Sequence, residues 1–368
     1  MRNYLSRART CALVLSALAV SLAGTQARAE TLEEFYKNNP LRIIVGYDNG
    51  GGYDVYARIL SRHIGRHLPG NPTTIVQNMP GAGSLVAVNY LYNVAPKNGS
   101  TIATFARNMA VLGILGKSKR IKFDIRKFTW LGSSSSYAED AYILWLRKDA
   151  KAKSLDEARK PGGPQLILGG TNEGSTGSDV PKILADTINL NVKQILGYKG
   201  SGGLFLAIDR GEIEGRITDL SAVRSNRPNY LKPDAFIRPI LQFARETRHP
   251  DFPNVPTARE LAKDAASLAF IELAEMPFKL ARPYAAPPGL SKDRAEALQK
   301  AFMAAHADPK YLDEAKKLHI GVSPIDGKAV LAMIDKISKA PAVSLDKMRD
   351  LYDAAERAKK ARRKKKEN

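Results

Sequence analysis

The stretch Leu41-Arg42-Ile43-Ile44-Val45-Gly46-Tyr47-Asp48-Asn49-Gly50-Gly51-Gly52-Tyr53-Asp54 decides the fold. Its first five residues form an apolar run that predicts a buried strand, and apolar residues then recur at helical spacing from Val55 to Leu68. The glycines in the turn between strand and helix lack a Cβ and can adopt positive φ, so they expose backbone N–H groups beside the electropositive end of the helix. The turn is therefore suited to hold an anion.

The same pattern follows at once in the chain. Residues 73–77 predict a second strand, 78–84 a second Gly-rich turn, 85–93 a second helix and 101–105 a third strand. Right-handed crossovers make the three strands parallel, so both Gly-rich turns lie at the carboxyl edge of one sheet. Open α/β sheets bind their ligands at that edge.

The second half of the chain repeats this architecture without repeating the sequence. Apolar runs predict strands at 142–146, 165–168 and 192–196, and Gly-rich turns follow the last two at 169–178 and 197–203. Two such lobes that face each other would form a cleft walled by N–H groups and hydroxyls. That cleft suits a carboxylate or a phosphate better than an apolar ligand.

The first 29 residues have the features of a secretory signal. Arginines at positions 2, 7 and 9 form a basic head, 11–24 is an apolar stretch, and Ala27-Arg28-Ala29 is a small-x-small cleavage site. The apolar stretch is too short for an ordinary membrane-spanning helix. We expect cleavage near Ala29 and export to the periplasm. Cys11 is the sole cysteine, so the mature chain would carry no disulfide and no cysteine-bound metal.

The chain length predicts two domains, because roughly 340 residues after the signal exceed what one hydrophobic core serves. We expect lobe 1 in residues 30–136, lobe 2 in 137–238, and a return to lobe 1 with C-terminal helices in 239–350. A strand at 236–243 would open that return. Two crossings between the lobes would let them hinge closed.

The remaining residues, 351–368, form a basic tail for which we expect no ordered structure. The net charge of the chain is +20, and 357–368 alone hold eight basic residues and one acidic residue. Such a run can bind nucleic acid or an anionic membrane surface, but a solvated tail is the simpler expectation. For an exported protein we expect no nucleic-acid partner, and we expect a monomer.

Seven short motifs, taken in order, resemble one known family. They lie at 41–58, 78–83, 95–101, 198–201, 211–214, 255–260 and 286–290. Together they resemble the solute-binding receptors of tripartite tricarboxylate transporters, the Bug family of periplasmic binding proteins. The likeness covers residues 41 to about 325, which is nearly the whole mature chain.

The resemblance implies a type II periplasmic binding protein fold, which is α/β with two lobes and a ligand cleft between them. It implies a small organic acid as ligand, whether a dicarboxylate, a tricarboxylate or an aromatic acid. It also implies delivery of that acid to a membrane permease of a large and a small subunit. Neither a catalytic residue nor a cofactor nor a metal is part of the family's pattern, so we expect none.

The chain departs from the family's pattern at the turns that would select the ligand. Tyr47 and Tyr53 lie in the first turn, where the family usually has proline and threonine. The third turn of the family commonly carries a histidine, and none lies between 169 and 181. Residues 218–219 are Thr-Asp where the family has Asp-Asn. Arg216 is unusual at its position, and it would either pair with a second ligand carboxylate or face solvent.

The candidate ligand contacts come from the turns at the two sheet edges. They are Tyr47, Asn49, Gly51, Gly52, Tyr53, Asp54, Asn78, Gly83, Ser84, Arg107, Asn108, Thr171, Ser175, Thr176, Lys199, Ser201, Arg216 and Asp219. Two interpretations stay open for some of them. Tyr53 either hydrogen-bonds the ligand or packs at a helix start, and Asn78 and Ser84 either contact the ligand or cap the backbone.

Patterns for catalysis are incomplete. His63 and His67 have a spacing able to bind zinc, but no glutamate follows His63 and no third ligand is evident. Residues 113–118 mimic a nucleotide P-loop, but Val111 stands where that loop needs glycine. No serine lies in a nucleophile elbow. The alternatives to a transport receptor are a secreted enzyme that acts on an acidic substrate and a binding protein that signals to a membrane sensor.

Overall fold

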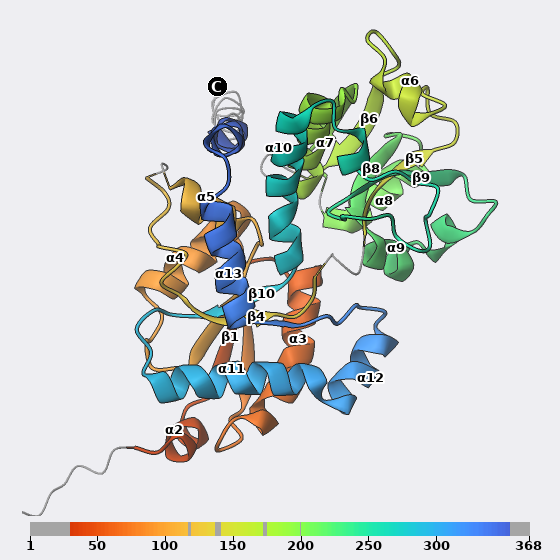
Figure 1. Cartoon of the computed structure of the whole chain (residues 1–368). Helices are drawn as coiled ribbons and strands as arrows, with labels where there is room; N and C mark the ends of the chain where they lie inside the picture. The colour runs from red at the N-terminus through yellow and green to blue at the C-terminus, as the bar shows by residue number, and fades with distance from the viewer. Residues whose placement is uncertain (1–29, 117–118, 137–140, 172–174, 199, 354–368) are drawn as a thin grey trace, which may run out of the picture.

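The protein is described here from a computed structural model that covers residues 30–116, 119–136, 141–171, 175–198 and 200–353. The predicted signal at 1–29, Lys199 and residues 354–368 of the predicted basic tail lie outside the described residues. The first three residues of that tail, 351–353, are helical, so the expectation of no ordered structure is wrong for them. The chain is a mixed α/β protein with two sheets (Figure 1). The α/β fold class is therefore confirmed.

The described residues form strands, α-helices and short 3-10 turns, with the following bounds. The strands are β1 (Leu41–Val45), β2 (Thr74–Asn78), β3 (Thr101–Thr104), β4 (Thr129–Ser133), β5 (Tyr142–Arg147), β6 (Leu166–Gly170), β7 (Val192–Leu196), β8 (Gly215–Asp219), β9 (Ile237–Phe243), β10 (Pro283–Ala286) and β11 (Ile325–Asp326). The α-helices are α2 (Leu32–Asn38), α3 (Gly52–Ile64), α4 (Leu85–Asn93), α5 (Met109–Leu115), α6 (Leu155–Arg159), α7 (Thr176–Ile188), α8 (Gly200–Asp209), α9 (Leu220–Asn226), α10 (Ala265–Glu275), α11 (Lys292–Ala307), α12 (Pro309–Lys317) and α13 (Gly327–Ser338). Short 3-10 turns are η1 (Gly65–His67), η2 (Ala82–Ser84), η3 (Pro228–Leu231), η4 (Arg259–Leu261) and η5 (Met276–Leu280). No helix in these ranges is both long and apolar enough to cross a membrane.

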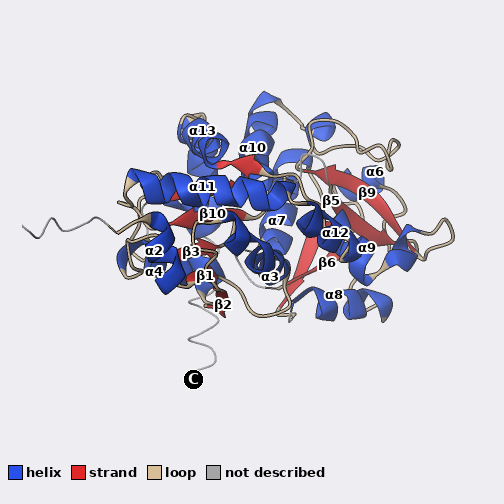
Figure 2. Ribbon diagram, turned by 90° about the horizontal axis from the view of Figure 1, so that it is seen from below, coloured by secondary structure: helices blue, strands red, loops and turns tan. Residues whose placement is uncertain are grey.

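The sheet of lobe 1 has the strand order β11-β4-β10-β3-β1-β2. β1 pairs in parallel with both β2 and β3, as the βαβαβ pattern predicted. Parallel strands are buried on both faces of a sheet. The apolar run of β1 is continuous because its side chains pack against helices on both faces. Ile43 packs toward α3 and α11, whereas Ile44 packs toward α4 and α5 on the other face. Figure 2 shows the strands in red, with the helices arranged around them.

The sheet of lobe 2 has the strand order β7-β6-β8-β5-β9. β6 pairs in parallel with β7 and β8, and β5 pairs antiparallel with β8. Leu144 and Ile217 contribute to the core cluster that includes the buried residues of α7, whereas Trp145 belongs to the cluster that includes those of α8. The polar turns after β6 and β7 therefore lie at one sheet edge, as they do in lobe 1.

The predicted return to lobe 1 at residue 239 is wrong. β9 pairs with β5, from Ile237 opposite Arg147 to Phe243 opposite Tyr142, and so forms the edge of the second sheet. The chain re-enters the first sheet as β10, which pairs with β3 and β4. An apolar run predicts a strand but does not show which strand it will pair with, because pairing depends on which sheet edge is open in the folded lobe.

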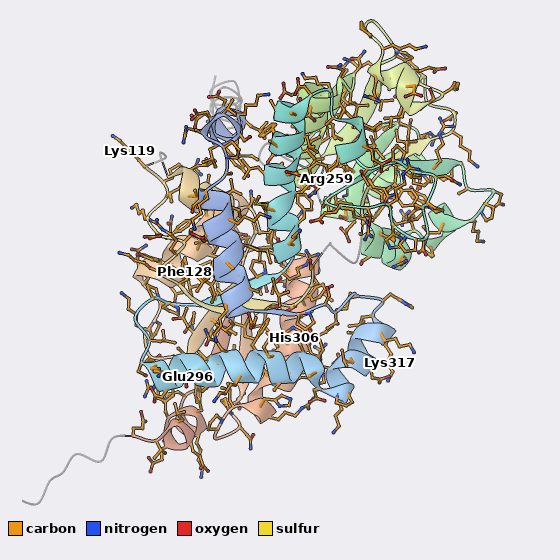
Figure 3. The ribbon with its side chains drawn as sticks, viewed as in Figure 1. Lys119, Phe128, Arg259, Glu296, His306 and Lys317 are labelled. Atoms are coloured by element: carbon orange, nitrogen blue, oxygen red, sulfur yellow. The ribbon has the colours of Figure 1, made fainter. Side chains whose placement is uncertain are left out.

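A buried ion pair marks the end of the second lobe, where α10 leads into the crossing. Glu275 is 1% exposed, and its carboxylate accepts hydrogen bonds from Arg259 at 2.6 Å and from the backbone N–H of Ala244 at 3.0 Å. Burial raises the pKa of Glu275 to about 7, against the opposing influence of Arg259. Arg259 is labelled in Figure 3, beside α10. The pair fastens the start of η5, which leads the chain back to lobe 1.

A buried histidine lies inside lobe 1, on α11. His306 is 2% exposed, and its ring bonds the Phe302 carbonyl and the Ser134 hydroxyl, each at 2.7 Å (Figure 3). Nδ1–H donates to the carbonyl, so Nε2 accepts from the hydroxyl and the ring is neutral. Burial lowers the pKa of His306 to about 4.

We expect His306 to make the protein sensitive to acid. A histidine whose pKa is depressed in the folded state contributes stability that is complete above pH 6.5 and is lost as the pH falls toward 4. The loss amounts to about 3 kcal/mol at pH 4 and below. Chemical denaturation from pH 7 to pH 4 should show a steeper fall for wild type than for His306→Gln, which keeps a donor and an acceptor but does not titrate. Parallel curves for the two proteins would contradict this.

Candidate functional site

A large cleft lies between the two sheets and is lined from both lobes. Its volume is about 1560 Å³. Among the predicted contacts, those that line it from lobe 1 are Tyr47, Asn49, Gly51, Gly52, Tyr53, Arg107 and Asn108. Those that line it from lobe 2 are Thr171, Ser175, Thr176, Ser201, Arg216 and Asp219. Turns that are far apart in the sequence thus face one space, and the tyrosines of the first turn leave it open.

Two predicted contacts, Asp54 and Asn78, lie behind the cleft wall instead of in it. Asp54 is 2% exposed, and its carboxylate accepts bonds from Gly50 N–H at 2.9 Å, Asn78 Nδ2 at 2.9 Å and Arg58 Nε at 2.8 Å. Burial opposes ionisation, but these bonds hold the pKa of Asp54 below its usual value. Asn78 Nδ2 also donates to the Tyr47 carbonyl at 2.9 Å. Both residues brace the glycine turn, and Gly50 N–H is used within the turn.

Ser84 and Gly83 do not line the cleft either. The Ser84 hydroxyl is fully buried, donates to the Gly46 carbonyl and accepts from Ala106 N–H, each at 3.1 Å. It thereby joins the ends of β1 and β3. A Cβ on Gly46 would stand 2.6 Å from the Ser84 oxygen, so glycine is required at 46 for this approach. Of the two interpretations of Asn78 and Ser84, the structure supports the backbone role.

An aromatic pair forms the floor of the lobe 1 side. The rings of Tyr47 and Tyr53 stack with centroids 4.7 Å apart at 14°. Tyr53 Oη accepts a hydrogen bond from Arg107 N–H at 3.1 Å. Burial raises the pKa of the Tyr47 phenol, so it stays protonated. Both tyrosines line the cleft, so they present ring surface to a ligand while they brace the turns.

Arg107 reaches across the cleft from the loop after β3. Its guanidinium donates to the Thr176 hydroxyl of lobe 2 at 2.7 Å, and it lies 4.3 Å from the centre of the Phe278 ring. The side chain is only 8% exposed. A cation held in this way over an aromatic ring, with its outer edge on the cleft, is well placed to receive an anion from either lobe.

Arg216 brings a second buried cation from lobe 2, at β8. It is 7% exposed, donates to the Ser201 carbonyl at 3.3 Å and to the Ser201 hydroxyl at 3.4 Å, and lies over the Phe205 ring. Among the described residues no carboxylate forms an ion pair with it, and its Nε has no hydrogen-bond partner there. Burial lowers its pKa. The interpretation that Arg216 faces solvent does not fit, because the side chain is buried at the cleft.

Arg282 is a cleft residue that the motif reasoning missed. It precedes β10 in lobe 1, is 8% exposed, and lies over the rings of Tyr53 and Tyr56 at 4.8 and 5.2 Å. A Cβ on Gly52 would stand 2.7 Å from its guanidinium, so the glycine turn lets this cation approach. The available signal was a single charge in the otherwise uncharged run 280–286.

Two long helices begin at the cleft without a side-chain cap. The N-caps are Gly51 for α3 in lobe 1 and Ser175 for α7 in lobe 2, and neither makes a capping bond. The buried Ser175 hydroxyl has no partner among the described residues. Asp219, by contrast, caps α9 by accepting from Ala222 N–H at 2.9 Å. Uncapped N–H groups from both lobes thus add to the positive potential of the arginines.

The two histidines whose spacing suits zinc lie against carboxylates. His63 Nε2 lies 2.7 Å from Glu314, and His67 Nε2 lies 2.9 Å from Asp308. Both acids belong to the α11–α12 region of lobe 1, so these contacts fasten α3, through His63, and η1, through His67, to those helices. Within the described ranges, no group of three or more His, Cys, Asp and Glu side chains is arranged to hold a metal ion.

Comparison with known proteins finds similar sequences among curated proteins. No protein-family model matches the chain. A curated protein named UPF0065 protein in gbd 5'region, from Cupriavidus necator, is 25% identical over 327 residues, which is 86% of this chain and 88% of that protein. Protein BugT from Bordetella pertussis is 27% identical over 257 residues, 67% of this chain and 73% of BugT.

Solved structures of the same kind share the fold. A TctC solute-binding protein from Polaromonas matches with a TM-score of 0.60 at 20% identity, over 84% of this chain and 98% of that one. The periplasmic binding protein BugD matches with a TM-score of 0.58 at 18% identity, over 86% and 97%. The resemblance to the Bug family is confirmed. At these identities the solved structures show a shared fold.

Proposed function

We propose that the protein is a periplasmic receptor that captures a small organic acid and delivers it to a tripartite tricarboxylate-type membrane permease. One observation carries the proposal. Arg107 from lobe 1 and Arg216 from lobe 2 are buried at the same cleft, and among the described residues no carboxylate forms an ion pair with Arg216. A buried cation is costly unless an anion compensates it. A ligand carboxylate supplies that compensation.

The two lobes then act on the ligand together. Arg107 and Arg282 surround the stacked tyrosines on one side, and Arg216 with the N-terminus of α7 stands on the other. A ligand contacts both sets only while the lobes are close, so its binding energy favours closure. The arrangement binds and releases an acid, and it needs no reacting group.

Two similar structures hold such acids. A MatC protein from Rhodopseudomonas palustris, with a TM-score of 0.59 at 18% identity, contains malate. Another R. palustris protein, with a TM-score of 0.59 at 16% identity, contains adipate. Dicarboxylates of this length are therefore the first candidates for this cleft, and the periplasm is the compartment that the proposal assigns.

Isothermal titration calorimetry with succinate, malate, adipate, citrate and benzoate tests the proposal. We expect at least one acid to bind and its uncharged amide to bind at least tenfold more weakly, since the amide cannot neutralise the arginines. A folded protein that binds none of the acids would overturn the receptor proposal. Consumption of the bound acid would instead favour an enzyme. Loss of uptake of that acid in cells without this protein would support delivery to a permease.

A further inference from the structure

A C-terminal helix begins at 342 and runs to the last described residue, 353. It follows α13 of lobe 1, and Pro341 starts it by accepting bonds from the N–H groups of Ser344 and Leu345. Figure 1 shows it in dark blue between α5 and the upper end of α10. The helix therefore lies where one lobe meets the other.

On one side the helix contacts lobe 2. Lys347 Nζ lies 3.0 Å from an Asp186 carboxylate oxygen on α7 and 5.6 Å from the centre of the Phe270 ring on α10. Met348 is 3% exposed and belongs to the apolar cluster that also holds Ile183 of α7. A buried side chain with a charged neighbour beside it fixes both the position and the rotation of the helix.

On the other side the helix contacts lobe 1 and the ligand cleft. The Tyr352 hydroxyl lies near the side chain of Asn108, at the start of α5, and near Arg107 and Asp179 of α7, and Tyr352 and Asn108 both line the cleft. Burial is the main reason that the pKa of this phenol lies above its usual value. Met348, Leu351 and Tyr352 all line the cleft. The helix thus touches both lobes and the space between them.

We propose that the C-terminal helix is a third wall of the ligand site, which holds the two lobes together and limits the size of the ligand through Tyr352. This inference rests on the proposed function for the ligand and on the contacts above for the lobes. The lobes cannot separate at this side unless Met348 leaves its apolar contacts and Lys347 leaves Asp186. The helix therefore favours the closed arrangement, and each acid binds more tightly because of it.

A matched pair of substitutions on this one helix tests the wall. Met348→Glu places a charge where the side chain is 3% exposed, whereas Val343→Glu places the same charge where it is 57% exposed. We expect Met348→Glu to weaken binding of the acid that wild type prefers by roughly tenfold or more, and Val343→Glu to leave it within about twofold. Small-angle X-ray scattering of the unliganded proteins should show a larger radius of gyration for Met348→Glu alone.

Tyr352 is tested by the size of the acids that bind. Tyr352→Ala removes a ring from the wall, so we expect short dicarboxylates to bind roughly tenfold more weakly and longer or aromatic acids to gain relative affinity. Tyr352→Phe keeps the ring and should keep the size preference. A variant without residues 354–368 should bind the acids as wild type does, since the residues that form the wall precede position 354.

The outcomes separate the two proposals. If wild type binds an acid and Met348→Glu binds it equally well with unchanged scattering, the wall is overturned and the receptor stands. If wild type binds no acid, the receptor fails, and scattering of Met348→Glu against Val343→Glu still decides whether the helix holds the lobes. If Met348→Glu does not fold, Lys347→Glu is used, with Lys347→Glu/Asp186→Lys as the charge-swapped rescue. A failure of the swap to restore wild-type affinity and scattering would count against the wall.

Discussion

Replacing Arg216 by methionine is expected to make the unliganded protein more stable while it removes most of the affinity for organic acids. Methionine keeps the length and apolar stem of the side chain but carries no buried charge. The Ser201 bonds it loses are long, at 3.3 and 3.4 Å, and so compensate the guanidinium weakly. Exchange of a poorly compensated buried charge for an apolar side chain is often stabilising, so we expect the Tm to rise by roughly 2 °C or more.

The ligand responds in the opposite direction. A charge-assisted bond inside a cleft is worth about 2 kcal/mol or more, so affinity should fall by roughly 30-fold or more. Calorimetry and thermal unfolding measure the two effects on the same samples. Arg42→Met, at an exposed site outside the cleft, serves as the control and should change neither. A fall in Tm together with the fall in affinity in Arg216→Met would show that the arginine stabilises the fold and would contradict this prediction.

Replacing Asp54 by alanine is expected to damage both folding and binding, although Asp54 does not line the cleft. The change leaves Gly50 N–H without its acceptor and removes the carboxylate that Asn78 and Arg58 share. Loss of one partner from a buried, charge-assisted network costs about 2 to 3 kcal/mol of unfolding free energy after allowance for the partly exposed Arg58. The glycine turn then loses its brace, so acid affinity should also fall by roughly tenfold.

Asp54→Asn separates charge from shape. Its amide oxygen can keep one of the bonds, so urea unfolding should place its stability between those of wild type and Asp54→Ala. Binding should follow the same order. If Asp54→Ala unfolds at the urea concentration of wild type, the turn is held by its glycines and neighbouring strands and the brace has no energetic role.

The local units of the fold could be predicted from sequence because neighbouring residues determine them. The bounds of β1, β7 and α4 agree with the predicted ranges, and the parallel pairing of β1 with β2 and β3 follows from the short βαβ connections. The edge that carries the polar turns follows from the same rule. The motifs, read together, were enough to indicate the family.

The direction of each side chain could not be predicted from the sequence. That direction determines which of the candidate residues line the cleft and which lie behind it. Tyr53 and Asp54 are adjacent in the sequence, yet the ring of Tyr53 lines the cleft while the carboxylate of Asp54 turns back into the loop. Sequence reasoning joined them because both follow the glycines. Which one meets a ligand depends on the Asn78 and Arg58 groups that lie behind the turn in the folded lobe.

By itself the sequence determined the two lobes and the glycine turns, since periodicity and turn chemistry act between residues close in the chain, and its short motifs carried the resemblance to the Bug family. Only the tertiary structure decided that β9 belongs to the second sheet, that Arg107, Arg216 and Arg282 surround one cleft, and that a helix near the end of the described chain forms part of its wall. These features join residues that lie far apart along the chain. Their energies come from burial and pairing that exist only after the lobes have packed.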